Sequence, residues 1–573
     1  MNNSSFDSFR GLSDAIQACT KGFIAVAIFA CVINILVLTV PLYTLQIFDR
    51  VLSSRSTDTL ILLLLVAFVA LLALALLEAA RGFVLLRLGT WFDLRLSGSI
   101  LSESLTVSLE KNMEPSVQGL RDVTTLRDFL SGPSVFPILD APWTPIFLAV
   151  LCLLHPYLGV MSLVGMLILF LFSLANEIGT RNFIGLSTET SITAMAKAEA
   201  SVRNADVVEA MGMKPNVLRR WHEQHTQSLD LQARASSRSI GITASSKFIR
   251  LSLQIGILSL GAWLVIQNEL TPGGMIAGSI LMGRAFAPVE QAIGSWRSMI
   301  RARAAYKRVK IQLSDWKPTS GRVKLPPPSG KLTIRELGYY YPNSSDPVLR
   351  NINFELSAGE ALGLVGPTAA GKTTLARLLV GNLRPRTGHV LLDGMDISKW
   401  DGDDLGPYLG YLPQDIELFG GTIKENIARM GDESDEEVMR ASNLAGAHQM
   451  VLGLPNHYET QVGEKGFALS GGQRQSVGLA RAVFGSPKLV VLDEPNSNLD
   501  HVGETALISA IKGLKSKGTT VVVIAHRPNI LQNVDKILVL RNKGVEMFGP
   551  PSEVIPALTG KNKQNVRGQS NGQ

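Results

Sequence analysis

Two things are scarce in this sequence: charge in the first half of the chain, and cysteine. The three cysteines, Cys19, Cys31 and Cys152, have neither paired nor metal-ligand spacing, and the last two lie inside apolar runs, which favours inert packing. The N-terminus lacks a basic segment followed by a small-residue cleavage site, which argues against a cleaved signal peptide. What the chain has in abundance is apolar sequence, with 46% hydrophobic residues among 573, and this length predicts more than one domain.

Long uncharged runs predict six membrane-spanning helices, because a helix needs about 20 apolar residues to cross a bilayer. The third and fourth share one uncharged run, which "LLHPYLG" breaks in the middle, so we expect a hairpin there. The sixth is the least apolar and carries Arg284, Glu290 and Gln291. The predicted spans are residues 23–48, residues 60–77, the two halves of residues 141–175, residues 248–266, and a stretch from Thr271 past Ile293.

The charges between these spans predict their direction. Lys and Arg are frequent in the two long segments after the second and fourth spans, and absent from the turns between spans three and four and between spans five and six. The positive-inside rule therefore places both termini and both long loops in the cytoplasm. This explains much of the net charge of +7 and weakens a nucleic-acid interpretation, so we expect no nucleic-acid partner.

Two pieces of the long loops are amphipathic, residues 116–132 and 205–221. They are either ordinary loop helices or elements that contact a cytoplasmic motor, and the second interpretation is favoured. Arg284 either lines a transport pathway, because charge inside a membrane usually faces a cavity, or marks where the sixth helix leaves the bilayer.

The second half of the chain has the pattern of a soluble α/β domain. We assign residues 1–310 to the membrane domain, 311–330 to a linker rich in Pro, Gly and Ser, 331–558 to the soluble domain and 559–573 to a disordered tail. Within "LGLVGPTAAGKTTLARLLVG" a strand, a glycine-rich loop and a helix follow one another, which is the pattern of a phosphate-binding loop. Its candidate nucleotide-binding residues are Gly366, Pro367, Thr368, Ala369, Ala370, Gly371, Lys372, Thr373 and Thr374.

Acidic and polar residues at the ends of later strands complete a hydrolytic set. Asp493, at the end of "LVVLD", is expected to hold Mg²⁺ together with Thr373, and Glu494 to polarise the attacking water. Gln414, Asp500 and His526 follow strands or turns in the same domain. An aromatic residue in "GYYYP" is expected to stack on adenine, and composition alone leaves Tyr339, Tyr340 and Tyr341 as candidates.

Residues 331–558 resemble the ATP-binding cassette (ABC) family through "GPTAAGKTT", Gln414, "LSGGQ", "VVLDEP", "SNLD" and His526. The resemblance implies ATP and Mg²⁺ as cofactors, Tyr341 as the adenine-stacking residue, Gln414 as a further metal contact, and Glu494 and His526 as catalytic residues. It also implies that two cassettes share each nucleotide site, so that Ser470, Gly471, Gly472, Gln473 and Asp500 serve ATP in a homodimer. The predicted fold is thus a polytopic α-helical membrane domain followed by an α/β phosphate-loop ABC domain.

The order of six spans and then one cassette resembles an ABC exporter half-transporter. "VPLYTLQIFDRVLSSRSTDTLILL" and "LDAPWTPIFLAVL" resemble the type I protein-secretion ATPases of the protease and lipase branch. That resemblance implies a multi-pass protein of a bacterial inner membrane, surrounded by membrane lipid. It further implies a secreted protein as substrate, and a periplasmic adaptor and an outer-membrane channel as partners. The alternatives are an exporter of lipids or small molecules, a soluble cassette ATPase acting on DNA, which the uncharged spans disfavour, and a channel or regulator, which the complete catalytic set disfavours.

Overall fold

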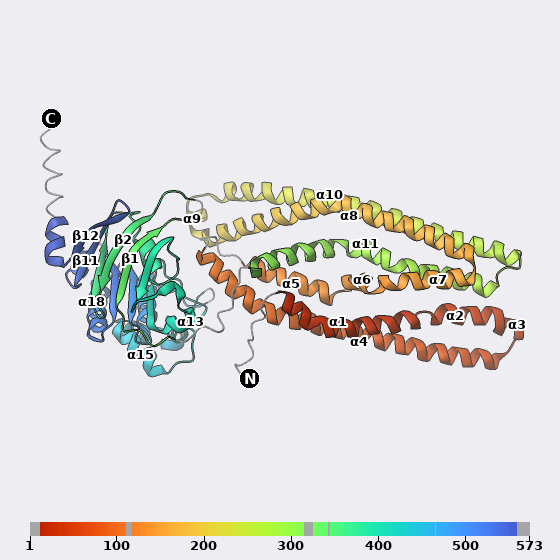
Figure 1. The fold of residues 1–573 in the computed structure, drawn as a ribbon, viewed down its shortest axis with the longest axis horizontal. Helices are drawn as coiled ribbons and strands as arrows, with labels where there is room; N and C mark the ends of the chain where they lie inside the picture. The colour runs from red at the N-terminus through yellow and green to blue at the C-terminus, as the bar shows by residue number, and fades with distance from the viewer. Residues whose placement is uncertain are drawn as a thin grey trace, which may run out of the picture. The chain divides into compact units, whose positions relative to one another are not determined.

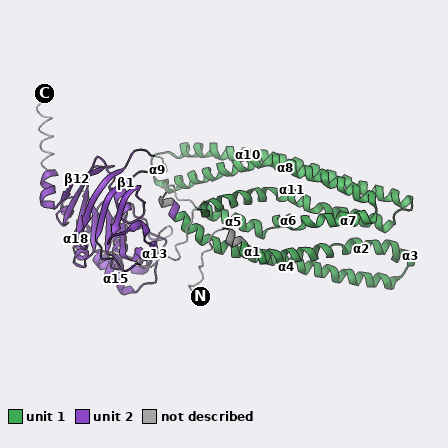
Figure 2. Cartoon of the chain, in the orientation of Figure 1, with its two compact units in different colours: residues 1–105, 115–318 green, residues 106–114, 319–573 purple. Residues whose placement is uncertain are grey.

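The structure is a computed structural model, and it describes residues 12–110, 117–314, 325–341, 344–463, 466–525 and 527–558. The chain forms two compact units, drawn in different colours in Figure 2. Unit 1 comprises residues 1–105 and 115–318, and unit 2 comprises residues 106–114 and 319–573. The predicted disordered tail, residues 559–573, lies outside the described residues.

Unit 1 consists of long helices laid side by side (Figure 1). Its α-helices are α1 (Leu12–Leu36), α2 (Thr39–Gln46), α3 (Leu52–Ser54), α4 (Thr57–Glu110), α5 (Gln118–Ser131), α6 (Phe136–Asp140), α7 (Thr144–Leu154), α8 (Pro156–Arg203), α9 (Ala205–Ala210), α10 (Lys214–Ile266) and α11 (Pro272–Ser314). A π-helical turn, η1 (Ile47–Val51), and two short 3₁₀ turns, η2 (Pro133–Val135) and η3 (Ala141–Trp143), connect some of them.

Among the described residues, five stretches of helix are long and apolar enough to cross a membrane, and they contain the first five predicted spans. They are Gln17–Ser54, Thr57–Val107, Pro133–Leu154, Pro156–Arg203 and Lys214–Ile266. The predicted hairpin between spans three and four is confirmed, because the chain turns at His155, whose backbone is extended between α7 and α8. The sixth predicted span forms a helix, α11, which is not among the five.

Helix α11 contains no stretch as apolar as these five, and much of it is covered by other helices. Its buried residues include Leu281, Met282, Ala285 and Phe286, and they form one core cluster with residues of α7, α8 and α10. The charged Glu290 of α11 pairs with Arg250 of α10 at 2.7 Å, while Arg284 is exposed within the unit. A role for Arg284 in a transport pathway stays a prediction. The helix continues to Ser314, inside the segment assigned to the linker.

The two stretches that resemble type I secretion ATPases both supply carboxylates that hold helices together. Asp49, in the π-helical turn η1, accepts hydrogen bonds from the Thr271 hydroxyl (2.6 Å) and the Gly273 N–H (2.9 Å) at the start of α11. Asp140 pairs with Arg81 of α4 at 3.1 Å. Because the Arg81 side chain is almost fully buried, this ion pair is costly to break and fixes how α4 lies against α6.

The described part of unit 2 contains three sheets. The first is antiparallel, with strand order β2-β1-β4-β5; the second has the order β12-β11-β3-β10-β9-β6 and is parallel except for β12; the third pairs β7 with β8. The strands are β1 (Leu332–Tyr339), β2 (Leu349–Leu356), β3 (Ala361–Val365), β4 (Thr387–Leu392), β5 (Met395–Asp396), β6 (Leu409–Leu412), β7 (Gly421–Thr422), β8 (Gln461–Val462), β9 (Leu489–Asp493), β10 (Thr520–Ile524), β11 (Lys536–Arg541) and β12 (Gly544–Gly549).

The central strands of the large sheet of unit 2 are apolar on both faces. Strands β9 and β10 are buried at every position, as expected for central parallel strands. The α-helices are α12 (Lys372–Leu379), α13 (Gly402–Leu405), α14 (Ile423–Ile427), α15 (Asp435–Leu444), α16 (His448–Leu452), α17 (Gly471–Val483), α18 (His501–Ser516) and α19 (Pro528–Leu531). Short 3₁₀ turns occur at η4 (Ile397–Lys399), η5 (Gly406–Tyr408) and η6 (His457–Glu459).

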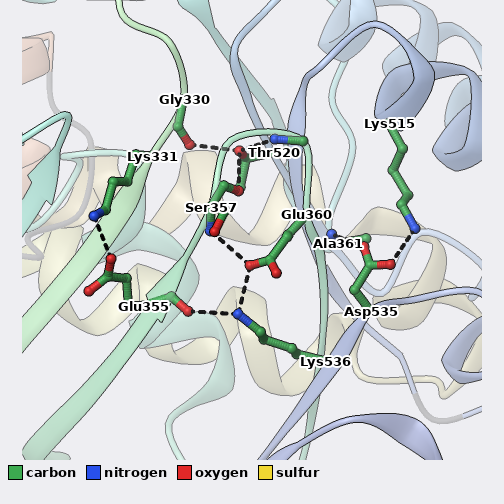
Figure 3. Close-up of polar contacts among 11 residues, drawn as sticks. Gly330, Lys331, Glu355, Ser357, Glu360, Ala361, Lys515, Thr520, Asp535 and Lys536 are labelled. Atoms are coloured by element: carbon green, nitrogen blue, oxygen red, sulfur yellow. Dashed lines mark hydrogen bonds and ion pairs between the residues drawn. The ribbon is translucent and has the colours of Figure 1, made fainter.

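A polar network ties the start of unit 2 to the amino ends of the parallel strands (Figure 3). The Thr520 hydroxyl donates to the carbonyl of Gly330 (2.6 Å), and Lys536 donates to the carboxylate of Glu360 (2.7 Å). Asp535 accepts from the backbone N–H of Ala361 at 2.8 Å. The bond to Gly330 holds the end of the predicted linker at the amino ends of the strands, so ligand sites are expected at the opposite, carboxyl ends.

Candidate active site

A cavity of about 430 Å³ lies at the carboxyl ends of the parallel strands in unit 2. Ligand sites of open α/β sheets lie at this edge. The cavity is lined by Tyr341, Val348, Thr368, Ala369, Ala370, Gly371, Lys372, Thr373, Thr374, Gln414 and Glu494. Ten of these eleven residues come from the predicted nucleotide and catalytic set, and Val348 is the addition.

The glycine-rich loop runs from the end of β3 to the start of α12. Gly371 precedes α12 with φ +92°, which favours glycine, and an added Cβ there would also press on a δ-methyl of Leu349 at 2.8 Å. Ala369 also has positive φ, +64°, which costs a residue with a Cβ about 1–2 kcal/mol. The loop thereby keeps a strained conformation at one position where glycine would be relaxed.

Lys372 is folded back onto its own loop. Its amine donates to the carbonyls of Gly366 (2.8 Å) and Pro367 (3.0 Å). Burial lowers the pKa of this amine, while the nearby carboxylates of Glu494 and Asp493 raise it. A buried cation that donates to two carbonyls can exchange them for phosphate oxygens, which bind it more strongly.

Asp493, the last residue of β9, is only 1% exposed. Neither of its carboxylate oxygens has a hydrogen-bond partner of normal geometry within the described part of the chain. Burial raises the pKa of this carboxyl, and the nearby Thr373 hydroxyl opposes that shift. Two buried carboxylate oxygens beside a hydroxyl form a hard oxygen donor set, so these residues fit Mg²⁺, which prefers such ligands.

Glu494 stands directly after β9 and has φ +48°, an uncommon backbone conformation for glutamate. Its N–H donates to the carbonyl of Ile524 at the end of the neighbouring strand β10 (3.2 Å). The Gln414 amide donates to its carboxylate at 3.3 Å. Strain of this kind is found at functional sites, where the surrounding structure holds a residue in place. Here it turns the carboxylate of Glu494 into the cavity rather than along the strand.

The structure separates the three tyrosines that composition left open. Tyr341 lines the cavity, and its hydroxyl shares a hydrogen bond with the Thr374 hydroxyl at 3.2 Å. Tyr339 is buried in the core, with its ring edge-on to that of Tyr341. Tyr340 lies under the guanidinium of Arg386 and away from the cavity lining.

The glycine-rich "LSGGQ" segment does not join this cavity. Ser470 caps α17 by accepting from the N–H of Gln473 (3.3 Å), and the Gln473 side chain accepts from the N–H of Ser470 (2.8 Å). Gly472 lies so close to the backbone of Asn498 that a Cβ would be 2.9 Å from its carbonyl oxygen. Asp500 caps α18 through the N–H of Gly503. These predicted residues therefore form a second surface, separate from the cavity of their own chain.

Gln475, which connects the two surfaces, was not predicted from the sequence. Its side chain is 1% exposed, donates to the backbone carbonyl of Glu494 (3.2 Å) and accepts from the N–H of Asn498 (3.1 Å). No spacing rule pointed to it, because its partners lie 19 and 23 residues further along the chain. Its only signal was a polar residue on the apolar face of α17.

The predicted catalytic residue His526 lies outside the described residues.

The fold and the cavity define an ATPase domain of the phosphate-loop class on the same chain as a bundle of membrane-length helices. The ABC transporter family matches residues 349–497, and the family of ABC transporter transmembrane regions matches residues 23–289. The type I secretion system ATP-binding protein PrsD of Rhizobium meliloti (strain 1021) is 41% identical over 94% of this chain and 93% of its own length. The chain therefore belongs to the ABC transporter family, in the group of type I secretion ATP-binding proteins.

One further relative and one solved structure are also similar to this chain. The leukotoxin translocation ATP-binding protein LktB of Mannheimia haemolytica is 28% identical over 95% of this chain and 78% of its own length. The solved structure of a bacterial Atm1-family ABC exporter with ATP bound superposes with a TM-score of 0.80, over 94% of this chain and 97% of that chain, at 21% identity. At that identity the likeness concerns the fold alone.

Proposed function

We propose that this chain couples ATP hydrolysis to the export of proteins across a bacterial inner membrane, as the ATPase and membrane-spanning subunit of a type I secretion system. The observation that carries the proposal is the 41% identity to a type I secretion ATP-binding protein along nearly the whole of both chains. A site for ATP and helices long and apolar enough to cross a membrane on one chain provide what such a subunit needs.

In this proposal ATP enters the cavity with its adenine on Tyr341 and its phosphates on the loop from Gly366 to Thr374. The loop N–H groups and the start of α12 attract phosphate oxygens. Lys372 exchanges its two carbonyl partners for the β- and γ-phosphates. The hydroxyl of Thr374 keeps Tyr341 in place.

Thr373, Asp493 and Gln414 would hold Mg²⁺, which neutralises charge on the phosphates when bound. Glu494 accepts a proton from the attacking water, and its strained backbone and the Gln414 amide orient its carboxylate. His526 is proposed as a second catalytic residue on the basis of the family pattern. Replacing Glu494 with Gln should leave ATP binding intact and nearly abolish turnover, which an ATPase assay with purified protein measures.

Two copies of the chain are proposed to form two nucleotide sites. Ser470, Gly471, Gly472 and Gln473 lie away from the cavity of their own chain and are free to bind the γ-phosphate held by a second copy. Asp500, at the start of α18, is proposed to serve the same site. Closure of the two ATPase domains on ATP would then drive the membrane helices.

The charge pattern supports a multi-pass arrangement with both termini and the ATPase domain in the cytoplasm. The proposed partners are a periplasmic adaptor protein and an outer-membrane channel, in addition to the secreted protein and the surrounding lipid. We assign residues 331–558 to the ATPase domain and residues up to 310 to the membrane domain.

The test is quantitative mass spectrometry of culture supernatants from cells with and without the gene, complemented with either the unmodified chain or the Glu494→Gln variant. Loss of a small set of secreted proteins, restored only by the unmodified chain, is expected and would identify the cargo. Unchanged supernatants would refute protein export and redirect the search to lipids or small molecules.

A further inference from the structure

A cavity of about 580 Å³ lies between α10 and α11 in unit 1. It is lined by Ser236, Ser239, Ile240, Thr243, Ala244 and Lys247 of α10 and by Ile293, Gly294 and Arg297 of α11. In Figure 1, α10 runs beside α8, and α11 approaches α10 toward one end of the bundle. We refer to this space as the α10–α11 cavity. Its volume is within the range of small-ligand pockets, so it has room for a few side chains and not for a folded domain.

The α10 side of the cavity presents a polar stripe. Ser236, Ser239, Thr243 and Lys247 are spaced by three or four residues, which places them on one face of the helix. On the other side Gly294 leaves space, since no atom lies within 4 Å of where its Cβ would be. Arg297 reaches across and donates to the hydroxyl of Ser236. Hydroxyls and cations from two helices thus face the same space.

The two cations in this cavity have no carboxylate partner among the described residues, and the lining itself contains no acid. The same two helices do pair their charges elsewhere. Arg250 of α10 pairs with Glu290 of α11 at 2.7 Å, and Arg234 of α10 pairs with Asp230 at 2.8 Å. Lys247 of α10 and Arg297 of α11 therefore line the cavity without a carboxylate partner among the described residues.

This arrangement selects for an anionic, hydrogen-bonding ligand. A carboxylate accepts hydrogen bonds from ammonium, guanidinium and hydroxyl groups at once, and such charge-assisted bonds are stronger than neutral ones. Ile240 and Ile293 flank the polar groups, so a side chain with an apolar stem and a charged end fits the lining. An unfolded polypeptide offers such side chains along an extended backbone.

We propose that the α10–α11 cavity binds aspartate and glutamate side chains of the exported polypeptide while that segment is unfolded. This inference rests on the proposed function and adds the chemistry by which cargo is recognised. Lys247 and Arg297 supply the charge, and Ser239 and Thr243 supply further donors.

The test uses the full chain in nanodiscs of uncharged phosphatidylcholine. The probes are a fluorescein-labelled, unstructured Gly/Ser peptide carrying several Asp residues, and the same peptide with each Asp replaced by Asn. Fluorescence anisotropy measures their dissociation constants. A photoreactive amino acid at position 244, where Ala244 lines the cavity without a proposed binding role, reports whether a bound peptide touches the cavity wall.

The Asp peptide should bind and cross-link, and the Asn peptide should bind at least about tenfold more weakly. The double variant K247Q/R297Q should weaken binding of the Asp peptide by a similar factor. The control is R234Q, which removes one positive charge from an exposed site on the same helix outside the cavity and should leave the affinity unchanged.

Equal affinity for the two peptides on the unmodified chain would overturn the inference without reference to any variant. Equal losses in K247Q/R297Q and R234Q would also overturn it, since the effect would then be that of net charge. If nanodiscs containing anionic phosphatidylglycerol abolish peptide binding and lipid becomes the cross-linked species, the occupant is a lipid headgroup. If supernatants of cells without the gene lose secreted proteins but the Asp and Asn peptides bind alike, the proposed function stands and only this inference fails. If those supernatants are unchanged, both the proposed function and this inference are overturned.

Discussion

Gln475 offers the sharpest test of how the ATPase domain works. Its buried amide bonds the carbonyl of Glu494 and the N–H of Asn498, and so it links the "LSGGQ" helix to the residue proposed as the base. Replacing Gln475 with Leu keeps the approximate volume and removes both hydrogen bonds. The backbone of Glu494, at φ +48°, then loses one of the contacts that hold it in a strained conformation.

The magnitude follows from the two bonds. Each contributes about 0.5–1.5 kcal/mol net, so the free energy of unfolding should fall by roughly 1–3 kcal/mol. The carbonyl of Glu494 keeps the N–H of Ser497 as a partner (3.2 Å), so only part of the loss affects the position of the carboxylate. A cost of about 1 kcal/mol in the transition state lowers kcat roughly fivefold. The KM for ATP should change little, because Gln475 does not line the nucleotide cavity.

The assay is steady-state ATP hydrolysis by the purified full chain, with Gln449→Leu as the control because Gln449 is an exposed glutamine on α16. The variant Gln475→Leu is then combined with Glu494→Gln. If Gln475 acts through the position of Glu494, it should have little further effect once that carboxylate is gone. A kcat within about twofold of the unmodified chain, or a full additional loss in the combined variant, would refute this reasoning.

Three further predictions follow from strained or buried groups. Replacing Asp493 with Asn should abolish hydrolysis. It should also raise the thermal midpoint of unfolding measured without nucleotide and Mg²⁺, because it removes a buried carboxylate that has no hydrogen-bond partner of normal geometry among the described residues. An unchanged or lower midpoint would contradict this. Replacing Ala369 with Gly should stabilise the nucleotide-free protein by no more than about 1 kcal/mol. The backbone strain at φ +64° is relieved, but glycine loses more conformational entropy on folding, which offsets part of the gain. Clear destabilisation in thermal unfolding would argue against strain at this position. Reversing the charge of one partner, as in Arg81→Asp or Asp140→Arg, should lower the thermal midpoint of detergent-extracted protein by an amount corresponding to about 3–5 kcal/mol. The double variant with the two residues exchanged should recover part of this loss. No recovery would mean that the pair does not interact as described.

Local sequence was sufficient for features that depend on a continuous stretch of residues. Five predicted spans lie within the five apolar helical stretches, because enough consecutive apolar side chains satisfy the length of a bilayer wherever they pack. The loop from Gly366 to Thr373 was equally readable, since its conformation depends on glycines at fixed positions between a strand and a helix. The hairpin at His155 was marked by a break in the apolar run.

Tertiary structure decided whatever depends on contacts between distant segments. It placed Tyr341 at the cavity and Tyr339 in the core, whereas the sequence of three adjacent tyrosines does not distinguish between them. It brought Gln475 against Glu494, and Glu290 against Arg250, across gaps that no local pattern encodes. It also explains why α11 contains no stretch as apolar as the five membrane-length ones: its neighbours bury much of it, and a helix shielded by protein does not need the uniformly apolar surface that lipid demands.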